Sequence, residues 1–155
     1  MSDYLERASQ HKTAYDRTAQ EYFQRKHIFD ENDRFLVETF ARFLDRRIPR
    51  QGNEHSVLDV GVGSGLNLEQ FEKLGYRTFG IDISEEMIRF ARISSPNTIF
   101  YAGDFLTFPF DRKFSGVFAK EFIHLFTKED AVKILDKMYE IREKNGLIYI
   151  TTTIH

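Results

Sequence analysis

The stretch Val57-Leu58-Asp59-Val60-Gly61-Val62-Gly63-Ser64-Gly65 decides how the rest of the chain is interpreted. Its first four residues indicate a short buried strand, and its three glycines indicate a tight turn before a helix. Glycine lets the backbone turn sharply and approach a ligand without a clash from Cβ. Three glycines within five residues are costly unless they are used, so we expect a ligand at this turn.

The glycine spacing is not that of dinucleotide-binding sheets, in which the third glycine stands three residues after the second. Here the second and third glycines, Gly63 and Gly65, are two residues apart, and position 66 is leucine. An acid, Asp59, also stands two residues before the first glycine. A carboxylate there suits a ligand that carries a cation better than it suits a pyrophosphate. An NAD-type oxidoreductase is therefore disfavoured, although it stays open as an alternative.

Strand and helix patterns alternate from residue 56 onward, which predicts an α/β fold with a doubly wound, mostly parallel sheet. The further strands are expected over residues 77–81, 98–102, 114–119 and 147–154. Only the link between the third and fourth strands lacks a clear helix. Residues 1–50 are expected to form an N-terminal helical cap, followed by the α/β core of residues 51–155. Ligands bind such sheets at the carboxyl ends of the strands, so these ends hold the candidate site.

Helical periodicity also predicts which residues face the core. The expected inward residues are Leu36, Phe40, Phe43 and Leu44 in the cap, and Ala131, Leu135, Met138 and Ile141 in the last helix. That last helix is expected to begin with a cap at Thr127 and to stop at Asn145-Gly146.

Acids follow the second and third expected strands. Asp82 stands 21 residues after Gly61, where an acid can accept hydrogen bonds from ribose hydroxyls. The alternative is that Asp82 belongs to the cap of the next helix, although Ser84 already suits that position. Asp104 can accept from an adenine amino group, with Phe105 beside the ring, or it is a solvated turn acid.

Taken together, these motifs resemble the class I S-adenosylmethionine-dependent methyltransferases that act on small molecules. The similar segments are the glycine stretch, Gly80-Ile81-Asp82-Ile83-Ser84, Gly103-Asp104-Phe105, Phe114-Ser115-Gly116-Val117-Phe118-Ala119 and Asn145-Gly146-Leu147-Ile148-Tyr149-Ile150. Tyr15-Asp16 and Tyr22 are similar to an aromatic N-terminal helix that caps the cofactor in this family. The resemblance covers roughly residues 13–154 and implies a Rossmann-like core with strand order 3-2-1-4-5.

The resemblance implies S-adenosyl-L-methionine as cofactor and S-adenosyl-L-homocysteine as product. The implied binding residues are Tyr15, Tyr22, Asp59, Gly61, Gly63, Gly65, Asp82, Ile83, Met87, Asp104, Phe105 and Lys120. Asp59 and the glycines would hold the amino-acid end, Asp82 the ribose, and Asp104 with Phe105 the adenine. Lys120 would contribute its backbone, since its side chain departs from the small or apolar residue that the family pattern leads us to expect.

Methyl transfer is an in-line displacement at a sulfonium carbon, so the protein mainly aligns the reactants. A general base is needed only where the acceptor must lose a proton, and His124, after the fourth strand, is the best candidate. The alternative is a packed, helix-side histidine, while Glu121 and Tyr22 are weaker candidates for the base. The remaining histidines lack a metal-ligand spacing and are expected at the surface, without a metal site; they are His11, His27, His55 and His155.

The composition limits the classes of partner that the chain is expected to bind. The 155 residues carry a net charge of −2, which gives no bulk field for nucleic acid or an anionic membrane. Cysteine is absent, which excludes disulfides, thiolate catalysis and Cys-ligated metals. No apolar run approaches the length of a membrane span, and the first residues lack the apolar stretch of a signal peptide. We therefore expect a cytoplasmic enzyme that methylates a small molecule, at nitrogen or oxygen rather than at carbon.

The end of the sequence raises a further alternative. The family normally adds a helix and an antiparallel hairpin, strands six and seven, after the fifth strand. Residues Leu147–Ile154 are rich in β-branched residues, without charge or proline, and would form an open sheet edge. We therefore expect either a homodimer through this edge or a fragment of a longer protein. In the second case the chain is a non-catalytic or truncated cofactor-binding domain that needs a partner.

Overall fold

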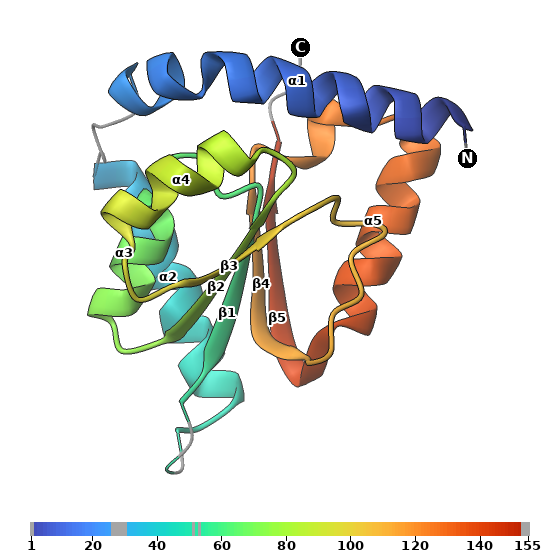
Figure 1. Cartoon of the computed structure of the whole chain (residues 1–155). Helices are drawn as coiled ribbons and strands as arrows, with labels where there is room; N and C mark the ends of the chain where they lie inside the picture. The colour runs from blue at the N-terminus through green and yellow to red at the C-terminus, as the bar shows by residue number, and fades with distance from the viewer. Residues whose placement is uncertain (1, 26–30, 51, 53, 153–155) are drawn as a thin grey trace.

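A five-stranded sheet in which all neighbouring strands are parallel forms the centre of the molecule (Figure 1). The computed structural model describes residues 2–25, 31–50, 52 and 54–152. The strands are β1 (Ser56–Val60), β2 (Arg77–Asp82), β3 (Ile99–Ala102), β4 (Phe114–Lys120) and β5 (Arg142–Thr151). Their order across the sheet is β3-β2-β1-β4-β5. The predicted fold class and the strand order implied by the resemblance are both confirmed.

Helices cover both faces of the sheet and one of its ends. On one face lie α2 (Glu31–Arg47), α3 (Leu66–Lys73) and α4 (Glu85–Ser94), and on the other lies α5 (Lys128–Glu140) (Figure 1). The first helix, α1 (Ser2–Arg25), lies across the carboxyl ends of the strands, and a short 3₁₀ helix, η1 (Ile123–Leu125), follows β4 (Figure 1). As expected, residues 103–113 connect β3 to β4 without a helix. No helix among the described residues is long and apolar enough to cross a membrane.

The two central strands β1 and β4 are mostly apolar because both of their faces are buried. Val57 and Phe118 pack with Phe40 of α2 and Phe71 of α3 in one cluster. Side chains on the opposite face of the same strands pack with α5 in a second cluster, which includes Leu58, Val117, Ile134 and Met138. These two layers fix the sheet, and with it the positions at which the strands end.

Four of the eight predicted inward residues on two helices are buried, namely Phe40, Leu44, Met138 and Ile141, whereas each of the other four stands one residue away from a buried position. In α2, Val37 is fully buried, whereas the predicted Phe43 is 49% exposed. In α5, Ile134 is fully buried, whereas the predicted Leu135 is 41% exposed. One residue corresponds to a rotation of about 100° around an α-helix. Apolar side chains flank the buried stripe on both helices, so the periodicity alone did not decide which side meets the sheet.

The last helix is shorter than predicted. It ends at Glu140, and Asn145 lies instead within β5, with a positive φ of 66°. The ladder is irregular there, because Phe114 pairs with Arg142 while Gly116 pairs with Leu147. Asparagine tolerates the left-handed conformation better than most residues. The Asn-Gly pair therefore accommodates a bulge inside the strand rather than ending the helix.

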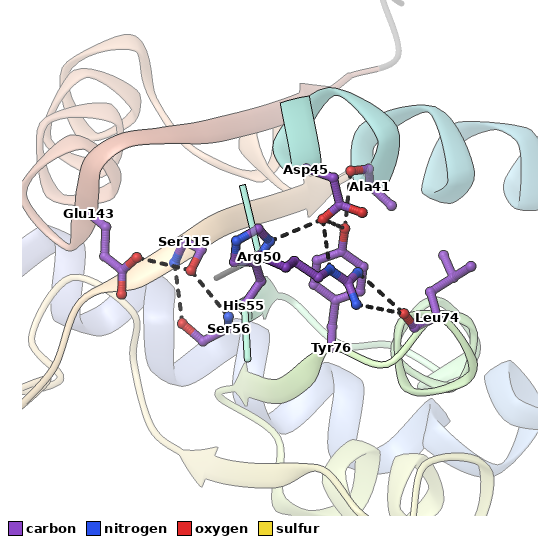
Figure 2. A network of polar contacts seen from close by, with 9 residues as sticks. All are labelled: Ala41, Asp45, Arg50, His55, Ser56, Leu74, Tyr76, Ser115 and Glu143. Atoms are coloured by element: carbon purple, nitrogen blue, oxygen red, sulfur yellow. Dashed lines mark hydrogen bonds and ion pairs between the residues drawn. The ribbon is translucent and has the colours of Figure 1, made fainter. Parts of the chain in front are cut away.

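A polar network joins α2 to the amino ends of the strands (Figure 2). His55 was predicted at the surface but is only 3% exposed, with its Nδ1 3.1 Å from Oδ1 of Asp45. The Tyr76 hydroxyl donates to the same oxygen at 2.7 Å, and the Arg50 guanidinium lies 4.3 Å above the Tyr76 ring. Burial tends to raise the pKa of Asp45, but the hydrogen bonds from Tyr76 and Arg50 hold it below its usual range. The network lies at the opposite end of the strands from α1 and stabilises the fold.

Candidate active site

A cavity that encloses about 760 Å³, part of it open to solvent, lies where the strands end beneath α1. Five segments line it: α1, the turn after β1, the start of α4, the link after β3 and the segment after β4. The lining residues are Ala8, His11, Tyr15, Tyr22, Val60, Gly61, Gly63, Ile81, Asp82, Ile83, Met87, Gly103, Asp104, Phe105, Lys120, Glu121, Phe122, Leu125 and Phe126. All the predicted cofactor residues except Asp59 and Gly65 are among them.

The glycine turn is built from left-handed backbone. Gly61, Gly63 and Gly65 have φ angles of 76°, 54° and 77°, which L side chains rarely adopt. A Cβ on Gly63 would lie 3.3 Å from the Tyr22 ring, so this glycine lets α1 approach the turn. A Cβ on Gly65 would lie only 2.8 Å from the Ala91 carbonyl oxygen of α4. Gly65 therefore permits close packing of α3 on α4 and does not reach the cavity.

Asp59 lies beneath the turn rather than in the cavity wall. Its side chain is 1% exposed, and its Oδ2 has no hydrogen-bond partner among the residues that the structure describes. Burial raises the pKa of this carboxyl well above its usual value, and the negative charge of Asp82 raises it further. Buried polar atoms are nearly always hydrogen-bonded, so an unpartnered carboxylate oxygen favours a bound proton, a donor or a cation beside it.

Asp82 lies in the cavity wall and also bonds the residue that caps the next helix. Its Oδ1 accepts from the backbone N–H of Ser84 at 2.9 Å, while the residue also lines the cavity. Ser84 caps α4, because its Oγ accepts from the N–H of Met87 at 3.1 Å. Burial raises the pKa of Asp82 to about 6, although N–H groups of Ser84, Gly63 and Ile83 favour its charged form. Asp82 is thus held at the cavity by its neighbours in the loop.

Asp104 is held from two sides. Its Oδ2 accepts from the Tyr4 hydroxyl of α1 at 2.5 Å, and its Oδ1 accepts from the backbone N–H of Thr107 at 3.1 Å. Burial raises the pKa of Tyr4, and the hydrogen bond to the Asp104 carboxylate raises it further. Tyr4 was missed in the sequence because its partner is 100 residues away along the chain.

Further contacts fasten α1 over the cavity. Arg7 donates to Asp130 at the start of α5 at 2.6 Å, and Asp16 accepts from the Ser84 hydroxyl at 2.5 Å. The Phe23 ring stacks on Phe90 of α4, with ring centroids 5.0 Å apart. The cavity-lining residues of α1 fall at helical spacings of three, four and seven, namely Ala8, His11, Tyr15 and Tyr22. This stripe is the signal that would have added Ala8 and His11 to the predicted site.

The segment after β4 differs from expectation in two places. Lys120 lines the cavity, and its ammonium group is paired with the Asp33 carboxylate of α2, which gives its unexpected side chain a structural partner. Glu121 has a positive φ of 53°, although it is not glycine, and its N–H donates to the Thr151 carbonyl at 3.1 Å. Left-handed backbone at a non-glycine residue costs free energy and is found more often at functional sites.

The positions of two histidines are the reverse of those predicted: His11 lines the cavity and His124 does not. His124 lies on η1, is exposed and does not line the cavity, with its Nδ1 3.8 Å from Oε2 of Glu121. His11, predicted at the surface, lies in the cavity wall with its ring edge-on to Phe126 at 6.2 Å between centroids. Within the described parts of the chain, no three His, Cys, Asp or Glu side chains gather as a metal site would require.

Known proteins are similar to this chain over the segments that line the cavity after the strands. A family model described as a methyltransferase domain matches residues 57–146. A dTDP-3-amino-3,4,6-trideoxy-alpha-D-glucopyranose N,N-dimethyltransferase of Streptomyces venezuelae is 33% identical over 97 residues, which are 61% of this chain and 41% of that protein. An uncharacterized methyltransferase of Alkaliphilus oremlandii is 25% identical over a match that covers 99% of this chain and 69% of that protein.

Solved structures agree with the fold. The crystal structure of DesVI from Streptomyces venezuelae matches with a TM-score of 0.62 at 29% identity, covering 76% of this chain and 50% of that one. The plantazolicin methyltransferase BpumL in complex with SAH matches with a TM-score of 0.69 at 25% identity, covering 86% and 51%. The chain thus spans about half the length of several proteins that it matches.

Proposed function

The chain belongs to the methyltransferase domain family, and from that membership we propose that it binds S-adenosyl-L-methionine and transfers its methyl group to a small-molecule acceptor. The observation that carries the proposal is a set of three acids near the ends of consecutive strands: Asp82 and Asp104 line the cavity, and Asp59 lies beneath its glycine turn. Carboxylates in this arrangement suit a ligand that joins a cation, a ribose and an amino-substituted base.

The residues present fit this cofactor. The unpartnered Oδ2 of Asp59 and the glycine turn above it suit the amino-acid end, which carries positive charge. Asp82 is placed for the ribose, and Asp104 with Phe105 for adenine. The remaining walls would come from Ile83, Met87, Tyr15, Tyr22 and the backbone of Lys120. When bound, the cofactor supplies an electrophilic methyl group on a sulfonium centre.

The protein's own contribution is alignment and exclusion of water. The helix α1 lies over the cavity, so the reactants would meet away from bulk solvent. The segment after β4 presents an apolar wall of Phe122, Leu125 and Phe126. His11 and Glu121 also line the cavity, with the His11 ring 6.2 Å from that of Phe126, and we propose that these two groups, in place of His124, hold the acceptor and take its proton.

We propose nitrogen or oxygen as the accepting atom. His11 and Glu121 could take the proton that such an acceptor loses, although a base by itself does not distinguish these atoms from carbon. The Streptomyces venezuelae relative is named as an N,N-dimethyltransferase of an amino sugar, which supports nitrogen first. Matched pairs of amine and alcohol acceptors, compared in a methyl-transfer assay, would separate the two.

The edge of the sheet supports a second, independent proposal. β5 pairs with β4 alone, so its other side carries backbone groups that no strand of the described residues covers. We propose that this edge pairs with a second copy of the chain or with a further segment of a longer protein. In the second case the domain binds the cofactor but needs that segment for full activity. Residues 153–154 of the predicted edge lie outside the described residues.

Calorimetry with S-adenosylhomocysteine and with NAD tests the cofactor directly. Asp82→Ala removes the hydrogen bonds that ribose hydroxyls would donate to a charged carboxylate, so we expect a loss of about 1.5–3 kcal/mol, or roughly ten- to 150-fold in affinity. Asp111→Ala, an exposed acid in the link after β3, is the matched control and should bind like the wild type. Tight NAD binding without any response to S-adenosylhomocysteine would overturn the proposal.

A further inference from the structure

The link between β3 and β4 shapes one end of the cavity without a helix to support it. Parallel strands are usually joined through a helix that packs on the sheet and fixes the residues before it. Here residues 103–113 contain no helix, yet they include Asp104 and Phe105 in the cavity wall. Some other contact must therefore hold this part of the wall in place.

Tyr4 holds the Asp104 side chain from α1, and Lys137 of α5 holds the backbone of the turn. Its Nζ donates to the carbonyl oxygens of Leu106 and Phe108, at 2.7 Å in each case. The same nitrogen lies 5.8 Å from the centroid of the Phe105 ring and 5.5 Å from that of Phe110. One ammonium group thus accepts no bond itself but donates to two carbonyls of the link and faces two aromatic rings of the link. A neutral side chain, or another rotamer of the lysine, would not reproduce this arrangement.

The turn that Lys137 holds is the one that orients Asp104. The Phe108 N–H donates to the Asp104 carbonyl at 2.9 Å, and the Thr107 N–H donates to the Asp104 carboxylate at 3.1 Å. Releasing the carbonyls of Leu106 and Phe108 would loosen the same five residues that carry these bonds. Burial lowers the pKa of Lys137, and the nearby Asp104 charge partly opposes that effect.

We infer that Lys137 is a positioning residue for the base-binding end of the cavity. It pins residues 104–108 so that the Asp104 carboxylate faces a 6-amino group and Phe105 lies beside the ring. It thereby sets a preference for adenine over a purine that lacks the amino donor. Lys137 itself does not line the cavity, so it acts through the turn. The inference rests on the proposed cofactor and adds the residue that gives the site its base selectivity.

The test compares S-adenosylhomocysteine with S-inosylhomocysteine, whose base carries an oxygen in place of the amino group. We expect the wild type to prefer the adenine compound by at least tenfold in calorimetry. Lys137→Met should lower affinity for that compound at least tenfold and bring the ratio of the two affinities to within threefold. Lys137→Arg, which keeps the charge and the donors, should restore most of the ratio.

Two controls separate positioning from general stabilisation. Lys133→Met makes the same change one turn earlier on α5, where the lysine contacts Asp130 and not the link, and its ratio should stay that of the wild type. In an Asp104→Ala background, Lys137→Met should change the ratio no further, because both act through one carboxylate. Hydrogen exchange of residues 104–108 in the unliganded protein should quicken in Lys137→Met alone.

Each outcome has one meaning. An unchanged ratio in Lys137→Met, or an equal collapse in Lys133→Met, overturns the inference and leaves the proposed cofactor standing. A wild type that binds neither compound overturns the proposed cofactor, and the inference with it. Should Lys137→Met fail to fold, Lys137→Gln, which keeps a donor without the charge, is measured in the same way, and an unchanged ratio there also overturns the inference.

Discussion

Replacing Asp82 with asparagine is expected to flatten the pH dependence of stability between pH 4 and pH 7. Burial raises the pKa of this carboxyl to about 6 in the folded protein, from an ordinary value of 3.8. Between these two values the folded chain keeps the proton that the unfolded chain has lost. The unfolded state therefore binds fewer protons in this window, and the wild type loses stability as the pH rises through it.

The size of the effect follows from the same two values. Their difference corresponds to about 3 kcal/mol of unfolding free energy, present in full only well below pH 3.8 and lost as the pH rises through 6. For a chain of this length that is a shift of roughly 6–12 °C in melting temperature. Asp59 acts in the same direction, since burial raises its pKa and the negative charge of Asp82 raises it further. Asp16 and Asp45, whose pKa values are lowered, lose their contributions only as the pH falls below this window.

The assay is thermal or urea unfolding of the ligand-free protein at four pH values from 4.5 to 7.5. Asp82→Asn should exceed the wild type by about 1 kcal/mol at pH 4.5 and by about 3 kcal/mol at pH 7.5. Asp136→Asn, an exposed acid on α5, should follow the wild-type profile. Parallel profiles for Asp82→Asn and the wild type would show that the buried charge is not what costs stability.

Three further changes test other parts of the structure. Gly65→Ala should destabilise the protein more than Gly75→Ala in urea unfolding. Both variants carry about 1–2 kcal/mol of left-handed strain, but only Gly65→Ala adds about 1–3 kcal/mol of overpacking against Ala91, so equal losses would refute the clash. His124→Ala should keep its affinity for S-adenosylhomocysteine within a few-fold, because His124 lies outside the cavity wall, and a large loss would place it within that wall. Ile150→Lys should convert a dimer to a monomer in analytical ultracentrifugation if β5 pairs with itself, whereas a wild-type monomer would count against self-pairing.

Most of the fold could be predicted from local sequence patterns. The strand before the glycine turn could be predicted because a short apolar run is bounded by residues with special backbone requirements, Gly61 above all. Ser84 could be predicted as a cap because a hydroxyl followed by acids is a local feature. The strand order came from resemblance to a family, since no residue pattern in the chain states which strands are neighbours.

The remainder depends on contacts between distant residues. Nothing near Tyr4 in the sequence indicates its hydrogen bond to Asp104. Nothing near His55 indicates that it will be buried with Asp45 as its hydrogen-bond partner. Lys137 looks like any polar residue on an amphipathic helix until the link after β3 is placed beside it. Partners of this kind are fixed by tertiary packing, which periodicity does not describe.

The way α1 is fastened has a consequence for how the protein folds. Its contacts with Ser84, Asp104 and Asp130 join residues 68, 100 and 123 positions apart, so this helix gains its full set of partners only after α5 has formed. Closing loops of that length costs entropy that only the finished contacts repay. A polar helix alone in water is marginal even at 24 residues. The first element of the chain is therefore the last to dock, and the cavity beneath it exists only once folding is complete.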